Sequence, residues 1–311
     1  MSTPAPPATG PVPAPFDRAL VRLRRNRAAA TLDRADFLFA EIADRLVERL
    51  GDVKRDFPRA LDLGCRDGAL ARALLATGQV GGVVAADLAP AMVRRARAAG
   101  LAAVAADEEA LPFADGSFDL VASVCTLDAT NDLPGALAQL RRALRPDGLL
   151  LAALFGGATL AELRDAWLAA EIAEEDGAGP RVAPFVALDM AAGLLQRAGF
   201  ALPVADLDTI TVTYPDALAL MRDLRAMGAG NALALRRRTP TRRATLARMV
   251  AEYAARHATD DGRVRATFEI VWLAGWAPAP TQPRAKPRGS ATARLADALG
   301  STEHTTGERP R

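Results

Sequence analysis

Acidic residues and glycines recur at intervals that suit a nucleoside ligand carrying a charged group. Asp62 and Gly64 lie where an apolar run, residues 59–65, gives way to a helical stretch, and Asp87 ends the next apolar run. Glycine lets the backbone approach a ligand closely, and an acid at the end of the second strand suits a bidentate hydrogen bond to a ribose diol. The spacing therefore predicts a cofactor site at the carboxyl edge of a parallel sheet.

The loop that follows Asp62 separates two classes of cofactor. A dinucleotide site uses G-x-G-x-x-G to present a helix N-terminus to a pyrophosphate. Here Arg66 stands at the middle glycine position and Ala69 follows Gly68, so that pattern is absent. Asp62 would repel a pyrophosphate, whereas it suits the ammonium group of a methionine moiety. We therefore expect S-adenosylmethionine rather than a nicotinamide cofactor.

A third acidic segment, DEEALPF at 107–113, is followed by DGSFD at 115–119. It resembles the L-P-F-x-D-G-S-F-D segment of the type 11 group of class I S-adenosylmethionine-dependent methyltransferases. In that group the acid after the third strand meets the adenine amino group, a role that the resemblance assigns to Asp107. The cofactor-binding residues expected on this basis are Asp62, Gly64, Cys65, Gly68, Asp87, Leu88, Asp107 and Glu108.

Other segments resemble a narrower family, the methyltransferase-like assembly factors of respiratory complex I. The matching pieces are FPRALDLGC (57–65), DEEALPF (107–113), NDLPGAL (131–137), LRPDG (144–148), LFGGATLAELR (154–164), DLRAMG (223–228) and RGSAT (288–292). The resemblance extends from about Phe16 to Leu295, and FGG-x-TL-x-ELR and RGSAT are not general methyltransferase features. It implies a protein substrate, an iron–sulfur subunit of complex I, and hydroxylation of an arginine.

The chain departs from this family at two places. Arg66 replaces a glycine, and we predict that its side chain projects outward from the loop. After the fourth strand the family usually has an aromatic/His pair that faces the reacting centre, where this chain has Asp128, Ala129 and Thr130. No catalytic residue is therefore predicted. With two histidines and two cysteines in the chain, a metal site is not predicted either.

Alternating strands and helices position these residues. Expected strands cover 59–65, 82–89, 101–107, 117–125, 149–157, 202–214 and 264–276. Expected helices cover 16–30, 36–50, 67–78, 90–100, 132–148, 159–174, 187–198, 216–227 and 240–257. Near-continuous apolar strands between helices indicate a parallel sheet covered on both faces. We predict an α/β fold with a doubly wound, Rossmann-like sheet of seven strands, in which the last two strands carry the antiparallel edge.

Composition limits the class of protein further. The 311 residues are 50% hydrophobic, carry a net charge of +2, and contain no apolar run of transmembrane length. Two cysteines do not make a disulfide framework, and the N-terminus does not resemble a secretory signal. We expect a cytoplasmic protein in a bacterium, or a mitochondrial matrix protein in a eukaryote. The expected domains are 1–15, disordered and Ala/Pro-rich; 16–50, N-terminal helices; 51–277, the cofactor-binding domain; and 278–311, a flexible tail.

Two arginine-rich segments leave alternatives open. Residues 16–30 form either a solvated helix with an apolar stripe of Phe16, Leu20 and Leu23, or a lid over the ligand pocket. We predict that a second cluster recognises a protein partner, since nucleic-acid binding would need a continuous basic stripe with aromatic residues. This second cluster contains Arg236, Arg237, Arg238, Arg242 and Arg243.

Three functions fit these observations. The chain is an enzyme that modifies a protein during complex I assembly, a carrier-protein or small-molecule O-methyltransferase like that of the biotin pathway, or a non-enzymatic assembly factor that binds the cofactor as a structural ligand.

Overall fold

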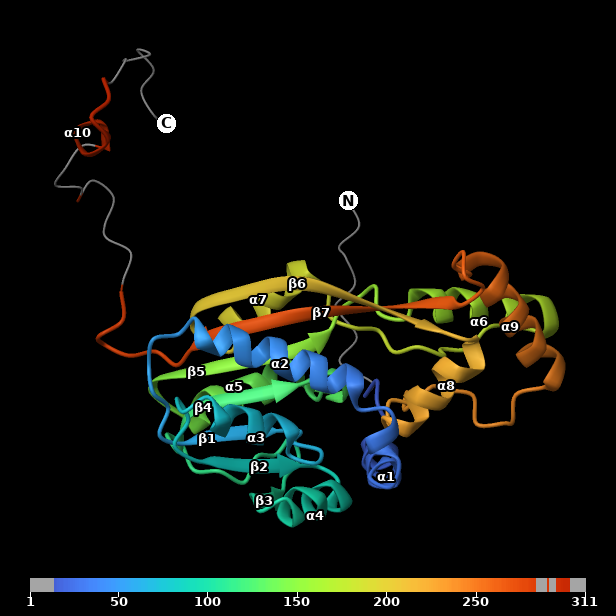
Figure 1. Ribbon diagram of the computed structural model, residues 1–311, viewed down its shortest axis with the longest axis horizontal. Helices are drawn as coiled ribbons and strands as arrows, with labels where there is room; N and C mark the ends of the chain where they lie inside the picture. Colours follow the sequence, from blue (N-terminus) through green and yellow to red (C-terminus); the bar gives the residue numbers. More distant parts are fainter. Residues whose placement is uncertain (1–13, 284–289, 291–294, 303–311) are drawn as a thin grey trace, which may run out of the picture. The chain divides into compact units, whose positions relative to one another are not determined.

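The computed structural model describes residues 14–283, 290 and 295–302. Its contacts divide the chain into two units, Met1–Pro278 and Ala279–Arg311. The first unit contains a seven-stranded sheet of order β3-β2-β1-β4-β5-β7-β6, which confirms the predicted fold (Figure 1). The strands are β1 (Ala60–Leu63), β2 (Val83–Asp87), β3 (Ala102–Ala105), β4 (Phe118–Val124), β5 (Leu144–Phe155), β6 (Ala201–Tyr214) and β7 (Val264–Trp276).

The strands β1 to β5 are parallel, and β7 runs antiparallel to both of its neighbours, β5 and β6. Every residue of β1 and β4 is buried, as expected where helices cover both faces of a sheet. Successive side chains alternate between the two faces. Leu61 and Leu63 belong to one apolar cluster and Ala60 to the other. Asp62 therefore projects from the same face as Ala60.

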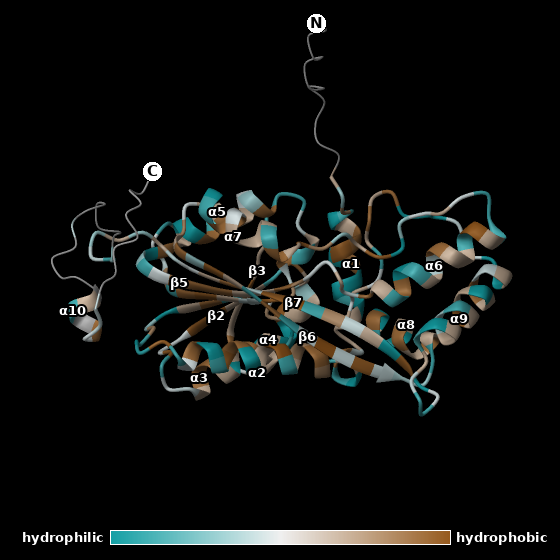
Figure 2. Cartoon of the chain, turned by 90° about the horizontal axis from the view of Figure 1, so that it is seen from above, coloured by the Kyte–Doolittle hydropathy of each residue, from teal (hydrophilic) through white to brown (hydrophobic). Residues whose placement is uncertain are grey.

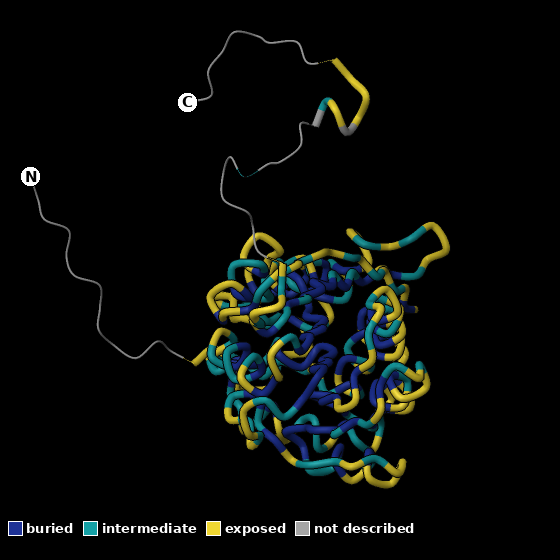
Figure 3. The backbone as a smooth tube through the Cα atoms, turned by 90° about the vertical axis from the view of Figure 1, so that its left-hand side faces the viewer, coloured by how far each residue is buried: buried dark blue, intermediate teal, exposed yellow. Residues whose placement is uncertain are grey.

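Helices cover the two faces in layers. The helices are α1 (Arg18–Ala28), α2 (Phe37–Gly51), α3 (Ala69–Ala76), α4 (Pro90–Ala98), α5 (Leu133–Ala143), α6 (Ala161–Glu174), α7 (Leu188–Arg197), α8 (Ala217–Ala226), α9 (Arg243–His257) and α10 (Leu295–Leu299). Figure 2 shows α5 and α7 on one side of the strands and α2 and α3 on the other. Figure 3 shows that the buried stretches lie inside the first unit, with exposed stretches around its periphery.

The expected helices and strands agree with the structure to within a few residues, except at the junction of α5 and β5. A helix over 132–148 was expected, but α5 ends at Ala143 and β5 begins at Leu144. Leu144 pairs with Phe118 of β4, so residues 144–148 belong to the sheet instead of the helix. The Pro-Asp-Gly segment lies inside β5, where Asp147 adopts a positive φ of 66°.

The strands β6 and β7 extend to a cluster of three helices, α6, α8 and α9 (Figure 1). Tyr253 of α9 is fully buried there, and its hydroxyl donates to the carbonyl of Arg265 at 2.8 Å. In the second unit, α10 lies in a segment for which no regular structure was expected. Residues 1–13 and all of the RGSAT motif except Ser290 lie outside the described residues. Within the described part of the chain, no helix is long and apolar enough to cross a membrane.

Candidate cofactor site

The predicted site residues meet at one edge of the sheet. Asp62 lies in β1, Asp87 is the last residue of β2, and Asp107 and Glu108 follow β3. Because β1, β2 and β3 are parallel neighbours, their carboxyl ends reach the same edge. This arrangement brings together four carboxylates from three segments that are far apart in the sequence.

Gly64 is required by the close packing of the β1–α3 loop. Its φ is +80°, and a Cβ atom there would lie 1.8 Å from Oγ1 of Thr126. Gly68 also has a positive φ of +83°, and a Cβ there would lie 2.1 Å from the Leu101 side chain. L-residues rarely adopt this backbone conformation. Gly64 therefore lets the loop run close to the end of β4, and Gly68 lets it run close to the segment between α4 and β3.

Asp62 is the least satisfied polar group in the site. It is buried, and both carboxylate oxygens lack a hydrogen-bond partner among the described residues. Burial raises the pKa of Asp62 to about 7. A buried carboxylate without donors favours an incoming cation, because the cation supplies both the charge and the hydrogen bonds. Asp62 therefore fits the ammonium group for which its position was singled out.

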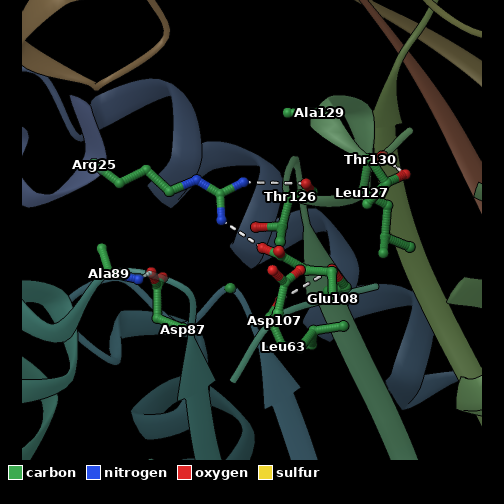
Figure 4. A network of polar contacts seen from close by, with 12 residues as sticks. Arg25, Leu63, Asp87, Ala89, Asp107, Glu108, Thr126, Leu127, Ala129 and Thr130 are labelled. Carbon is green, nitrogen blue, oxygen red and sulfur yellow. Dashed lines mark hydrogen bonds and ion pairs between the residues drawn. The ribbon is translucent and has the colours of Figure 1, made fainter. Parts of the chain in front are cut away.

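Asp87 is held by the backbone at the end of β2. Its carboxylate accepts hydrogen bonds from the N–H groups of Arg66 at 3.1 Å and Ala89 at 2.8 Å, the second of which is drawn in Figure 4. Burial raises its pKa despite these bonds and the nearby Arg25 charge. A carboxylate has about four acceptor sites, so lone pairs remain for ribose hydroxyls. Leu88, the next residue, is buried and Cys65 is buried in the loop.

The prediction that Arg66 projects outward is wrong. Its guanidinium lies over the ring of Phe39, 3.6 Å from the centroid. It donates to the carbonyls of Val124 and Cys125, each at 2.8 Å, and to that of Gly64 at 3.3 Å. Arg66 turns inward because the carbonyls at the end of β4 offer it acceptors and α2 offers it an aromatic face. Its side chain shares a narrow cavity of about 40 Å³ with Asp62.

Two arginines of α1 close the opposite part of the site. Arg25 donates to Oε1 of Glu108 at 2.5 Å and to the carbonyl of Thr126 at 3.1 Å (Figure 4). Arg18 pairs with the other oxygen of Glu108, with Asp107 at 2.5 Å, and with the carbonyl of Ala129 at 2.9 Å. Burial alone would raise the pKa of Glu108, but the two arginines hold it below its usual range.

The apolar stripe expected on this helix is also wrong in part. Phe16 is buried, but Leu23 is exposed and Leu20 is only half-buried, whereas Val21 and Ala28 are the buried residues of α1. Arg18 and Arg25 lie seven residues apart, one heptad, on the same side as Val21 and Ala28. That spacing was the signal for an inward-facing arginine pair. The geometry favours the lid over the solvated helix.

Asp128 lies beyond the end of β4, in the segment where the family usually has an aromatic/His pair. Its Oδ1 accepts from the N–H of Phe155 at 2.6 Å, and its Oδ2 is buried with no partner among the described residues. Burial raises the pKa of Asp128 to about 7, and the charges of Arg66 and Arg25 oppose that rise. Sequence reasoning noted the departure but gave this carboxylate no role.

Three of the five arginines of the second cluster form ion pairs within the chain. Arg236 pairs with Asp17 at 3.1 Å, and Arg237 and Arg242 both pair with Glu175, at 3.1 Å and 3.6 Å. These ion pairs fasten the segment before α9 to the start of α1 and the end of α6. The expected protein-recognition surface is therefore smaller than the sequence suggested, and its role stays a prediction.

Comparison with known proteins agrees with this geometry. The family model described as a methyltransferase domain matches residues 61–152, which include most of β1 and all of β2, β3 and β4. The structure of the YcgJ protein from Bacillus subtilis has a TM-score of 0.54 at 14% identity and covers 75% of this chain and 98% of YcgJ. At that identity it supports the fold alone.

Curated relatives match nearly the whole chain. "Arginine-hydroxylase NDUFAF5, mitochondrial" of Danio rerio is 38% identical, over 91% of this chain and 88% of that protein. "Malonyl-[acyl-carrier protein] O-methyltransferase" of Halorhodospira halophila is 40% identical, over 88% of this chain and 92% of that protein. The chain belongs to the class I methyltransferase-fold family that contains these two groups. It is thus an enzyme of the S-adenosylmethionine-dependent, transferase-like class.

The site fits the cofactor of this family. Both oxygens of Asp62 lack a hydrogen-bond partner among the described residues, which suits a methionine ammonium. The cofactor is S-adenosylmethionine. Among the described residues, no cluster of His, Cys, Asp and Glu side chains has the arrangement of a metal site.

Proposed function

We propose that this enzyme uses the edge formed by β1, β2 and β4 to bind S-adenosylmethionine and modifies an arginine side chain of a protein during assembly of respiratory complex I. Support comes from relatives named arginine-hydroxylase, which are 38% and 40% identical in Danio rerio and Homo sapiens. The segments LFGGATLAELR and RGSAT, which resemble the complex I assembly family, point the same way. An iron–sulfur subunit of the complex is the substrate that this resemblance implies.

The observation that carries the proposal is the buried, unpartnered Oδ2 of Asp128. Its Oδ2 lacks a hydrogen-bond donor among the described residues, and it stands at the family position that faces the reacting centre. A guanidinium offers planar, charge-assisted hydrogen bonds that match a carboxylate. Binding of an arginine would also favour the ionised form of Asp128, whose pKa is about 7 in the free protein. A cationic acceptor therefore suits this edge.

A second candidate is O-methylation of a carrier-bound malonyl group, favoured by the 40% identity to the Halorhodospira halophila enzyme. The acceptor in that reaction is a carboxylate. Asp128 would repel it, and the positive charges nearby are already engaged, Arg25 with Glu108 and Arg66 with backbone carbonyls. The charge distribution therefore favours the arginine substrate over the malonyl substrate.

The chain's own residues divide the work of binding. In this proposal Asp87 holds the ribose hydroxyls, Asp107 the adenine amino group and Asp62 the methionine ammonium, while Asp128 orients the acceptor arginine. The bound cofactor supplies an electrophilic sulfonium centre. Hydroxylation of the guanidinium adds one oxygen atom and removes two electrons, so it also requires an external two-electron oxidant. Alignment of cofactor and acceptor is the contribution that we assign to the protein.

The test combines a deletion strain with mass spectrometry. Deletion should reduce assembled complex I without creating a biotin requirement, and a complex I subunit should lose a modified arginine, detected as one oxygen atom or one methyl group. Re-expression of the native chain should restore both, whereas Asp128→Asn should not. A biotin requirement with normal complex I would establish the malonyl activity instead. Complex I restored by Asp87→Ala without the arginine modification would establish the non-enzymatic function.

A further inference from the structure

We propose that Arg66 occupies the place of the cofactor's methionine ammonium in the free protein and thereby sets how strongly the site selects ligands that carry this group. The inference rests on the proposed cofactor function. It concerns the loop between β1 and α3, where the family has a glycine and this chain has an arginine. Its consequence is that part of the ligand's binding free energy is spent on displacing a side chain of the protein.

The contacts of Arg66 are those that an ammonium group would seek. Three backbone carbonyls, of Gly64, Val124 and Cys125, accept from its guanidinium. These carbonyls belong to the two strand ends, of β1 and β4, between which the cofactor's amino-acid part must lie if Asp87 takes the ribose. Carbonyl oxygens are acceptors only, so each attracts a cationic donor.

Asp62 makes the same place anionic. The cavity that Arg66 lines is also lined by Asp62, Asp36 and Asp67. Arg66 makes no hydrogen bond to Asp62, whose oxygens are unpartnered in the described structure. The guanidinium thus balances the negative charge of the cavity while it is bonded to the carbonyls, and the Asp62 carboxylate keeps both oxygens without a hydrogen-bond donor from the described part of the chain. A smaller ammonium could contact both the carbonyls and Asp62, which the guanidinium does not do here.

An ammonium group in this cavity would lie beside the Arg66 guanidinium, which lines it. Like charges at close range in a poorly solvated space repel strongly. Binding of the ligand's ammonium therefore favours departure of the guanidinium from the carbonyls and from the ring of Phe39. A ligand without an amino-acid part does not need this exchange, because Asp87 and Asp107 lie at the ends of other strands.

Arg66→Gly is a clean variant for the test. The φ of Arg66 is +49°, in the left-handed region that glycine adopts without cost. Glycine therefore suits the backbone of the loop, and it removes the competing cation together with its bonds to the carbonyls and its contact with Phe39. Arg72→Ala is the matched control, because Arg72 lies on the neighbouring helix α3 and its guanidinium, among the described residues, donates hydrogen bonds to Asp67 alone.

The experiment compares two ligands by calorimetry with the full chain. S-adenosylhomocysteine carries the amino-acid group, and 5′-methylthioadenosine lacks it. Arg66→Gly should bind S-adenosylhomocysteine about tenfold more tightly than the native protein, since charge-assisted hydrogen bonds no longer have to be broken. Its affinity for 5′-methylthioadenosine should change less than about twofold. Phe39→Leu, which keeps the arginine but removes the ring beneath it, should shift the ratio of the two affinities in the same direction by about two- to fivefold.

The outcomes are distinguishable. Equal changes for both ligands, or no change for either, would overturn the role of Arg66 while leaving the cofactor assignment intact. Weaker binding of S-adenosylhomocysteine by Arg66→Gly would also overturn it and would mean that Arg66 holds the ligand's carboxylate. Binding of neither ligand to the native protein or the variant would contradict the cofactor assignment as well. A change in affinity for S-adenosylhomocysteine in Arg72→Ala as large as that in Arg66→Gly would show that any positive charge near the loop weakens binding, and not the place of Arg66 in particular.

Discussion

Removing the charge of Glu108 should release α1 from the sheet. The Glu108 side chain is fully buried, and the two arginines that it holds, Arg18 and Arg25, are only 14% and 13% exposed. Glu108→Gln keeps the shape of the side chain but leaves those guanidinium groups without their shared carboxylate. Removal of one partner from a buried ion pair costs about 3–5 kcal/mol.

The contacts that Arg18 and Arg25 keep in Glu108→Gln place the loss of stability at the lower end of this range. Arg18 retains Asp107 at 2.5 Å and the carbonyl of Ala129, whereas Arg25 retains only the carbonyl of Thr126 among its hydrogen-bond acceptors. The glutamine oxygen can still accept one hydrogen bond. We therefore expect Glu108→Gln to lower the free energy of unfolding by about 3 kcal/mol at neutral pH. The pKa of Glu108 is lower in the folded than in the unfolded protein. Its ion pairs should therefore stabilise the native protein fully above the unfolded-state pKa, and this stabilisation should disappear as pH falls through the folded-state pKa.

Urea unfolding measures this loss, and hydrogen exchange locates it. Amides of α1 should exchange faster in Glu108→Gln, while those of β4 should keep their relative protection. Glu41→Gln is the control, because Glu41 is 49% exposed and pairs with Arg45 one helical turn away, an interaction worth about 0.3–0.5 kcal/mol. A loss below about 1 kcal/mol for Glu108→Gln, with exchange of α1 unchanged, would refute the idea that this ion pair fastens the lid.

Three further variants test the site itself. Asp87→Ala should weaken S-adenosylhomocysteine binding by about 2–3 kcal/mol in calorimetry, because it removes charge-assisted hydrogen bonds to the ribose; an unchanged dissociation constant would argue against that role. Burial raises the pKa of Asp62 from 3.8 to about 7, so the stability of the free protein should fall as pH rises across this interval. Asp62→Asn should remove that fall and stabilise the free protein at pH 8 by up to about 4 kcal/mol, yet weaken binding of the ligand's ammonium; an equally steep pH profile in the variant would contradict this. Gly64→Ala should lose ligand binding, since its Cβ would collide with Thr126 at a positive φ, and wild-type affinity would show that the loop is not held as described.

The sequence alone determined the sheet and the position of its acids. Apolar runs separated by helical stretches marked the seven strands, and a parallel sheet necessarily brings the ends of β1, β2 and β3 to one edge. Asp62, Asp87 and Asp107 could therefore be assigned to a common site from their order along the chain. The need for glycine in the β1–α3 loop could also be predicted, because a turn that packs closely against a neighbouring segment has no room for a Cβ.

Only the tertiary structure decided what the arginines do. Arg66 was expected to point outward because an inward side chain at a family glycine position would lower affinity for the ligand. Its partners are instead carbonyls at the end of β4, 58 and 59 residues away. Arg25 meets Glu108 across 83 residues, and Arg236 meets Asp17 across 219. A long, flexible cation can reach many acceptors, and local sequence does not say which backbone carbonyl or carboxylate the fold will place within its reach. The position of α1, the inward turn of Arg66 and the ion pairs of Arg236, Arg237 and Arg242 all depend on tertiary packing, which local sequence does not reveal.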